Sequence, residues 1–176
     1  LAPGSFIGII GGGQLGRMLA MAAARLGYRT IVLEPDSNAP AAQVANTQIV
    51  ADYDDPAALQ QLADLCDVVT YEFENVPVKA VQWLESRVPV RPGSKALEVA
   101  QDRLMEKAMA RELGAETALF SAVANRPDLD AAIETTGLPA VLKTTRLGYD
   151  GKGQAKLVRP EDADTAFAAM QGQMAI

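Results

Sequence analysis

The sequence predicts an α/β protein in which a parallel sheet with helical connections is followed by a second, α+β unit. Apolar β-branched runs alternate with helix-forming segments over roughly the first ninety residues, as in successive βαβ units. The first of these runs stops at a glycine turn that opens a helix. After Ser94 the character changes to strong helix formers and a second glycine-rich loop, which predicts a domain boundary there, give or take several residues.

Composition excludes several classes of protein. The 176 residues are 49% hydrophobic, enough for a sizeable core, and the net charge of −6 without a basic patch argues against nucleic acid and anionic membranes as partners. The chain has no histidine, so histidine-based triads and zinc sites are absent. The single Cys66 lies in an apolar run and is expected to be a buried thiol of a reducing compartment. No apolar run reaches the ~18 residues of a membrane span. The cytoplasm is therefore the expected location.

Apolar runs and the turn residues that flank them define the elements expected in the first half. Gly27 ends a helix, and the pair Asp55-Pro56 begins one. The expected strands are Phe6–Ile10, Arg29–Leu33, Thr47–Ala51, Asp67–Tyr71 and Val88–Val90. The expected helices are Gln14–Leu26, Pro56–Leu65 and Val78–Ser86.

The second half is expected to begin with one long helix that ends at Gly114. Gly137 ends a shorter helix, and the segment Arg146–Gly153 is a glycine-rich loop between two strands. The expected helices are Lys95–Leu113, Pro127–Thr136 and Pro160–Met170. The expected strands are Thr117–Val123, Pro139–Thr145 and Gln154–Val158.

The first motif is the glycine turn. Gly11, Gly13 and Gly16 fit the pattern G-x-G-x-x-G between a strand and a helix, where free N–H groups and the helix dipole attract an anion. Glu34 ends the second strand, where an acid would hold a ribose hydroxyl of a nicotinamide dinucleotide. The alternatives are a tight turn without ligand and a solvated Glu34. The motif alone does not identify the anion.

The second motif is a lysine on a strand, Lys143, followed five residues later by a glycine-rich loop, Gly148–Gln154. The lysine supplies a point charge and the loop supplies backbone donors, so the pair can clamp a triphosphate. It is not a Walker A sequence, because no Gly-Lys-Ser/Thr opens a helix. A plain β-hairpin needs fewer glycines than this loop contains.

Two further clusters are weaker signals. Arg103 and Lys107 share one helix face and suit a phosphate or an adenine-side contact, although Glu106 is equally consistent with a solvated charged face. Glu72 and Glu74 follow the strand that ends at Tyr71, and they share a face if that strand continues. Their carboxylates could accept hydrogen bonds from a ligand amine or hydroxyls. The alternative is an acidic loop.

Four stretches in a fixed order, GIIGGGQLGRML, CDVVTYEFENVP, QDRLMEK and VLKTTRLGYDGKGQ, together resemble the N5-carboxyaminoimidazole ribonucleotide synthetase family of ATP-grasp enzymes. The resemblance covers nearly the whole chain. It implies a Rossmann-like pre-ATP-grasp domain over residues 1–94 and the N-terminal part of an ATP-grasp domain over 95–176, comprising a linker helix and a small lid subdomain. It further implies that ATP phosphorylates bicarbonate and that the amine of 5-aminoimidazole ribonucleotide captures the carboxyl group.

The resemblance also implies roles for individual residues. Arg103, Lys143 and more weakly Lys107 are implied as ATP contacts, under a phosphate-covering loop made of Gly148, Tyr149, Asp150, Gly151, Lys152, Gly153 and Gln154. Lys143, Asp150 and Lys152 are the catalytic candidates. The ribonucleotide is expected to contact Gly13, Gln14, Leu15, Glu72 or Glu74, Tyr149 and Asp150, with its phosphate on the backbone N–H groups of Gln14 and Leu15.

The family is longer than this chain, and its magnesium ligands are expected beyond Ile176. The free chain is therefore expected to be inactive, and a homodimer is implied for the full-length protein. A nicotinamide-dependent oxidoreductase, supported by the glycine turn and Glu34, and a non-catalytic nucleotide-binding module stay open as alternatives at this point.

Overall fold

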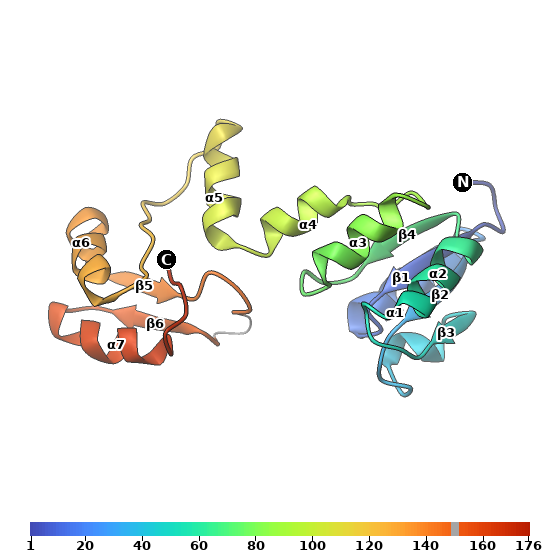
Figure 1. Ribbon diagram of the computed structural model, residues 1–176, viewed down its shortest axis with the longest axis horizontal. Coiled ribbons are helices and arrows are strands. Elements are labelled where there is room, and N and C mark those ends of the chain that lie inside the picture. Colours follow the sequence, from blue (N-terminus) through green and yellow to red (C-terminus); the bar gives the residue numbers. More distant parts are fainter. Residues whose placement is uncertain (149–151) are drawn as a thin grey trace. The chain divides into compact units, whose positions relative to one another are not determined.

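The computed structural model describes residues 1–148 and 152–176, and it divides the chain into two compact units, Leu1–Glu98 and Val99–Ile176 (Figure 1). The first unit is built on a four-stranded parallel sheet with the strand order β3-β2-β1-β4. Its strands are β1 (Phe6–Ile10), β2 (Arg29–Leu33), β3 (Thr47–Ile49) and β4 (Val68–Tyr71). This arrangement confirms the predicted α/β class.

Helices cover both faces of this sheet. Helix α1 (Gln14–Arg25) and the short 3-10 helix η1 (Pro40–Gln43) pack on one face, where Ile9 and Val32 meet Ala20. Helices α2 (Pro56–Leu65) and α3 (Val78–Glu85) pack on the other face, around a larger core that contains Leu62 and Leu84. Because β1 is central and buried on both sides, the turn that follows it is fixed in place.

Helix α4 (Ser94–Ala100) has its last two residues in the second unit. Helix α5 (Arg103–Glu112) follows in that unit. A two-stranded antiparallel sheet follows, made of β5 (Ala140–Lys143) and β6 (Gln154–Leu157). Helices α6 (Arg126–Thr136) and α7 (Ala163–Ala169) pack together in one apolar core with Leu142 and Leu157. A 3-10 turn, η2 (Pro160–Asp162), leads into α7.

Several expected elements are wrong. The expected helix Lys95–Leu113 is two helices, because the Asp102 side chain accepts the N–H groups of Leu104 and Met105 and so begins α5 anew. The expected strand Val88–Val90 forms only a single parallel bridge, between Val90 and Val69. The expected strand Thr117–Val123 forms only the bridge of Val123 with Ala175. Residues 160–162 are 3-10 helix, and η1 was not expected.

Candidate functional site

The glycine turn lies between two acidic residues at the carboxyl edge of the first unit's sheet. Ile10 at the end of β1 is in register with Leu33 of β2 and with Tyr71 of β4. The next residue of each strand is therefore Gly11, Glu34 or Glu72, and parallel pairing brings these three positions together. The N–H group of Glu72 donates to the Ile10 carbonyl at 3.0 Å, which anchors this arrangement.

The carboxylate of Glu72 occupies the start of helix α1. One of its oxygens accepts the N–H of Gly13 at 2.6 Å, and the other accepts the N–H of Gly16. A side chain on Gly11 would overlap Glu72, and a Cβ on Gly16 would lie 2.6 Å from the carbonyl oxygen of Gly11. The glycines of the fingerprint therefore make room for a carboxylate of the same chain and for the tight turn.

Glu34 is bound to its own unit in the same way. Its Oε2 atom accepts the N–H of Gly12 at 2.8 Å and the hydroxyl of Tyr53 at 2.6 Å. Burial raises the pKa of Tyr53, and the hydrogen bond to Glu34 raises it further. Glu34 thus serves to hold the turn in place, and the pyrophosphate position of a dinucleotide site is filled by side chains. The glycine turn and Glu34 therefore no longer support a nicotinamide-dependent oxidoreductase.

Two backbone N–H groups of the turn have no hydrogen-bond acceptor among the described residues. Gln14 and Leu15 are exposed at the first turn of α1, and no acceptor in the described part of the chain pairs with their N–H groups. These groups and the helix dipole favour an anion. Strand β4 ends at Tyr71, so Glu72 and Glu74 do not share a strand face, and Glu74 is exposed. The structure therefore brings Gly13, Gln14, Leu15 and Glu72 together.

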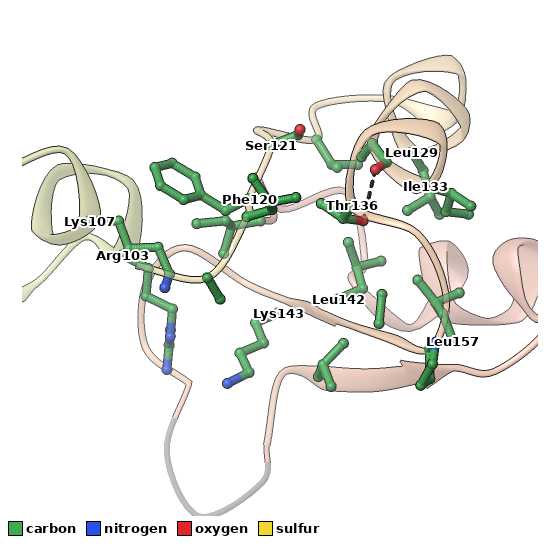
Figure 2. A pocket seen from close by; sticks show the side chains of 18 of the residues that line it. Arg103, Lys107, Phe120, Ser121, Leu129, Ile133, Thr136, Leu142, Lys143 and Leu157 are labelled. Atoms are coloured by element: carbon green, nitrogen blue, oxygen red, sulfur yellow. Dashed lines mark hydrogen bonds between the residues drawn. The ribbon is translucent and has the colours of Figure 1, made fainter. Parts of the chain in front are cut away.

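In the second unit, Lys143 is the last residue of β5 and is half-buried. Its side chain and that of Arg103 extend toward the same side of a pocket, away from Leu129 and Ile133 (Figure 2). Two cations that converge on one space suit a polyanionic ligand.

The start of helix α5 binds the residues that lead into the glycine-rich loop. The Arg103 guanidinium donates to the carbonyls of Thr144 at 2.8 Å and Gly148 at 2.6 Å. Asp102 accepts from Arg146 at 3.1 Å while it caps α5. Arg103 therefore orients the residues that lead into the loop, and it does so with two of its five N–H groups.

Of the loop residues predicted to contact ATP, Tyr149, Asp150 and Gly151 lie outside the described residues. Gly153 has a φ of +65°, and a Cβ there would lie 2.6 Å from the Thr144 hydroxyl, so this position requires glycine. Lys152 is exposed, and Gln154 is exposed opposite Lys143 in the β5–β6 ladder.

A pocket of about 620 Å³ lies in the second unit, between α5, the segment 118–121 and β5 (Figure 2). Lys107 lines it, with its ammonium 5.6 Å from the centre of the Phe120 ring. The Arg111 guanidinium lies 4.2 Å from the same ring and donates to Thr117 and Ala118. Arg103, Lys107 and Lys143 thus meet at this pocket.

Family models match both parts of the chain. The model described as the ribonucleotide synthetase preATP-grasp domain matches residues 5–101, and the one described as the ATP-grasp domain matches residues 108–176. The chain belongs to the ribonucleotide synthetase preATP-grasp family. The family resemblance seen in the four motifs is confirmed.

Three comparisons with relatives of this chain are informative. The N5-carboxyaminoimidazole ribonucleotide synthase of Brucella melitensis biotype 1 is 57% identical, over 100% of this chain and 49% of that protein. The Staphylococcus aureus N5-carboxyaminoimidazole synthetase complexed with ADP has a TM-score of 0.94 at 41% identity, over 99% of this chain and 47% of that one. An Aspergillus clavatus synthase in complex with ADP and 5-aminoimidazole ribonucleotide has a TM-score of 0.82 at 29% identity, over 98% of this chain and 46% of that one. The chain spans about half the length of these relatives.

No cluster of three or more Asp, Glu or Cys side chains within residues 1–148 and 152–176 is placed to hold a metal ion. None of the helices described is long and apolar enough to cross a membrane.

Sequence reasoning missed three residues that shape these sites. Tyr53 reaches Glu34 from outside any motif, and nothing in the sequence signals it. Phe120 lines the pocket, and Arg111 packs against the Phe120 ring without lining the pocket itself. The spacing of Arg103, Lys107 and Arg111 at successive four-residue steps along α5 is the signal that would have extended the predicted cationic face.

Proposed function

We propose that this chain binds the nucleotide and the acceptor of an ATP-dependent carboxylation, in which 5-aminoimidazole ribonucleotide and bicarbonate give N5-carboxyaminoimidazole ribonucleotide. ATP transfers its terminal phosphoryl group to a bicarbonate oxygen, which gives ADP and carboxyphosphate. A nitrogen–carbon bond then forms at the acceptor's amine, and inorganic phosphate leaves. Names and ligands of the relatives support this proposal. Because its proposed substrates are phosphorylated small molecules, we propose that the protein acts in the cytoplasm.

The observation that carries the proposal is the convergence of Lys143 and Arg103 beside the base of the glycine-rich loop. In our proposal, the Lys143 ammonium contacts the nucleotide's phosphates as a point charge, and Arg103 adds the N–H groups that the loop carbonyls leave free. Lys107 lies farther along the same pocket and would make a secondary contact. Backbone N–H groups of the 148–154 loop would complete the phosphate site, with Lys152 as its basic side chain.

The acceptor is assigned to the first unit. The open N–H groups of Gln14 and Leu15 would receive the ribonucleotide's phosphate, as helix N-termini do elsewhere. Glu72 lies at the same turn, and its oxygens have lone pairs beyond the two hydrogen bonds that they accept. Glu72, or the exposed Glu74, would then accept from a ribose hydroxyl or from the amine.

Titration calorimetry with the two ligands separately tests this division. Lys143→Met keeps the apolar stem and removes the charge, so it should weaken ADP binding about tenfold or more, or ~1.4 kcal/mol, while 5-aminoimidazole ribonucleotide binds as before. Lys79→Met, at an exposed position of α3 in the first unit, is the matched control and should change neither affinity. Equal loss of both ligands in Lys143→Met would show that the lysine is structural. Absence of ADP binding by the unaltered chain would contradict the nucleotide assignment.

We also propose that the protein self-associates through helix α1. Its side away from the sheet exposes Leu15, Met18 and Leu19, with 57%, 57% and 41% of their surfaces accessible, and neighbouring exposed apolar side chains suit a contact with another protein. A Met18→Glu variant should dissociate at protein concentrations where the unaltered chain is dimeric. Sedimentation velocity at several concentrations measures this, and unchanged sedimentation of the variant would reject α1 as the contact.

A further inference from the structure

In the first unit, Tyr53 contacts both of the sheet-edge segments that carry the carboxylates of the glycine turn. It lies between β3 and α2 and is half-buried. Its hydroxyl donates to Oε2 of Glu34 at 2.6 Å, and its ring lies edge-on to the ring of Phe73, with the ring centres 5.5 Å apart. Phe73 directly follows Glu72 in the chain. A single side chain from a third loop therefore links the segment after β2 to the segment after β4.

Three donors among the described residues hold the carboxylate of Glu34. Its Oε2 atom accepts the N–H of Gly12 at 2.8 Å and the Tyr53 hydroxyl, and its Oε1 atom accepts the N–H of Asp36 at 3.1 Å. The bond from Asp36 is local, two residues along the same loop, and does not by itself direct Oε2 to the turn. Tyr53 comes from a different loop, so its hydroxyl determines where Oε2 lies.

The Gly12 peptide in turn determines where the open N–H groups of the turn lie. Gly12 stands two residues before Gln14, its N–H is bound by Glu34, and its carbonyl accepts the N–H of Ala41 at 2.8 Å. A Cβ on Gly12 would lie 2.5 Å from Cγ of Glu34, so the stem of this side chain packs directly against the peptide. A displacement of Glu34 therefore displaces the backbone that leads into helix α1.

The hydroxyl of Tyr53 acts as a donor in this network. Burial raises the pKa of Tyr53, and the hydrogen bond to Glu34 raises it further, so the proton stays on the phenol at neutral pH. A hydrogen bond from a hydroxyl to a carboxylate is stronger than one between neutral groups. A half-buried carboxylate that lost this donor would have to turn toward water or toward Asp36 to replace it, and its bond to the Gly12 N–H would weaken.

We propose that Tyr53 is a positioning residue for the phosphate of the acceptor. It holds the Glu34 carboxylate on the Gly12 N–H, and through this contact it keeps the N–H groups of Gln14 and Leu15 directed at that phosphate. The inference rests on the proposed function, which assigns the acceptor's phosphate to those two groups. The ring of Tyr53 packs against the apolar core of the first unit and contributes to stability. The hydroxyl carries the positioning role, so the two contributions can be separated by removing the hydroxyl alone.

Tyr53→Phe tests the inference, because it removes the hydroxyl and keeps the ring with its contact to Phe73. Tyr28→Phe is the matched control, since the Tyr28 hydroxyl donates to the Leu1 carbonyl at 3.2 Å and Tyr28 precedes β2, at the opposite end of that strand from Glu34. Titration calorimetry measures the affinities for 5-aminoimidazole ribonucleotide and for ADP separately. Tyr53→Phe should weaken ribonucleotide binding roughly fivefold or more and leave ADP binding unchanged, and Tyr28→Phe should change neither. In NMR spectra the Gly12 amide proton should move upfield in Tyr53→Phe, because its hydrogen bond to Glu34 lengthens.

A double-mutant cycle with Glu34→Ala shows whether Tyr53 acts through Glu34. Once the carboxylate is absent, Tyr53→Phe should lower the ribonucleotide affinity no further. The inference is overturned, and the proposed function left standing, if Tyr53→Phe binds the ribonucleotide as the unaltered chain does, if its loss persists in full beside Glu34→Ala, or if the Gly12 amide proton does not move. Equal loss of ribonucleotide and ADP would also overturn it, because the hydroxyl would then be structural. If the unaltered chain does not bind the ribonucleotide, the proposed function fails and the inference fails with it.

Discussion

Replacing Glu72 by glutamine should destabilise the first unit, because the carboxylate fills the start of α1. Glu72 accepts two N–H groups, from Gly13 and Gly16, at the positive end of a helix dipole. Glutamine offers one acceptor oxygen, and its NH₂ group must face the other N–H. The lost charge-assisted hydrogen bond costs about 1.5–3 kcal/mol and the lost charge at the helix end about 0.3–1 kcal/mol. We therefore expect the free energy of unfolding to fall by roughly 2–4 kcal/mol.

Urea unfolding followed by the fluorescence of Trp83 measures this change. Trp83 is the single tryptophan of the chain, and it packs against the core of the first unit. With a slope of about 2 kcal/mol per molar urea, the midpoint should fall by roughly 1–2 M. The exposed Asp54 supplies the control, since Asp54→Asn removes the same charge and should shift the midpoint little. If Glu72→Gln unfolds at the same urea concentration as Asp54→Asn, the carboxylate does not hold the turn.

Three further outcomes follow from individual side chains. Burial raises the pKa of the Cys66 thiol to about 12. Iodoacetamide at pH 8 should therefore label Cys66 slowly in the native chain and rapidly in urea, and fast labelling of the native chain would contradict this. Arg111→Met removes the bonds that hold segment 117–120, so the backbone 15N order parameters of this segment should fall while those of α7 are unchanged, and unaltered order parameters would deny Arg111 this role. Hydrogen bonds from Ser94 lower the pKa of Glu85, so its contribution is present above the unfolded pKa and lost as pH falls through the folded one. Glu85→Gln should therefore be less stable than the unaltered chain at pH 7, and the difference should vanish in acid once Glu85 is protonated in both the folded and the unfolded state, as thermal melts across pH would show.

The parts of the fold that sequence predicted well are those whose signals are local. Strands β1 and β2 have the expected bounds, since each is a short β-branched run between turn residues. Helix α2 also matches, because Asp55 caps it through the N–H of Ala58 and Pro56 begins it. The place of each strand in the sheet, by contrast, follows from pairing between segments that are distant in the sequence.

The errors in the second unit have separate physical causes. Asp102 carries a helix-start signal, but it stands among strong helix formers, and the break of α4 from α5 depends on its cap. The segment 117–123 has the composition of a strand and lacks a neighbour over most of its length. Only Val123 finds one, in Ala175. A segment of strand-like composition forms a strand only where another strand pairs with it, which explains why 117–123 forms one bridge and no ladder among the described residues.

The glycine fingerprint shows how far a motif can identify a ligand. Its physical content is a backbone that turns tightly at the start of a helix and attracts negative charge. In this chain Glu72 and Glu34 supply negative charge at three of the turn's N–H groups, and they do so from positions 56 and 22 residues away from their partners Gly16 and Gly12. No local pattern encodes contacts of that range. The same glycines therefore fit a dinucleotide, a phosphomonoester or an internal carboxylate, and the acids at the ends of the neighbouring strands decide among them. At this sheet edge they leave the N–H groups of Gln14 and Leu15 as the open donors of the turn, which suits one phosphate group better than the two of a dinucleotide.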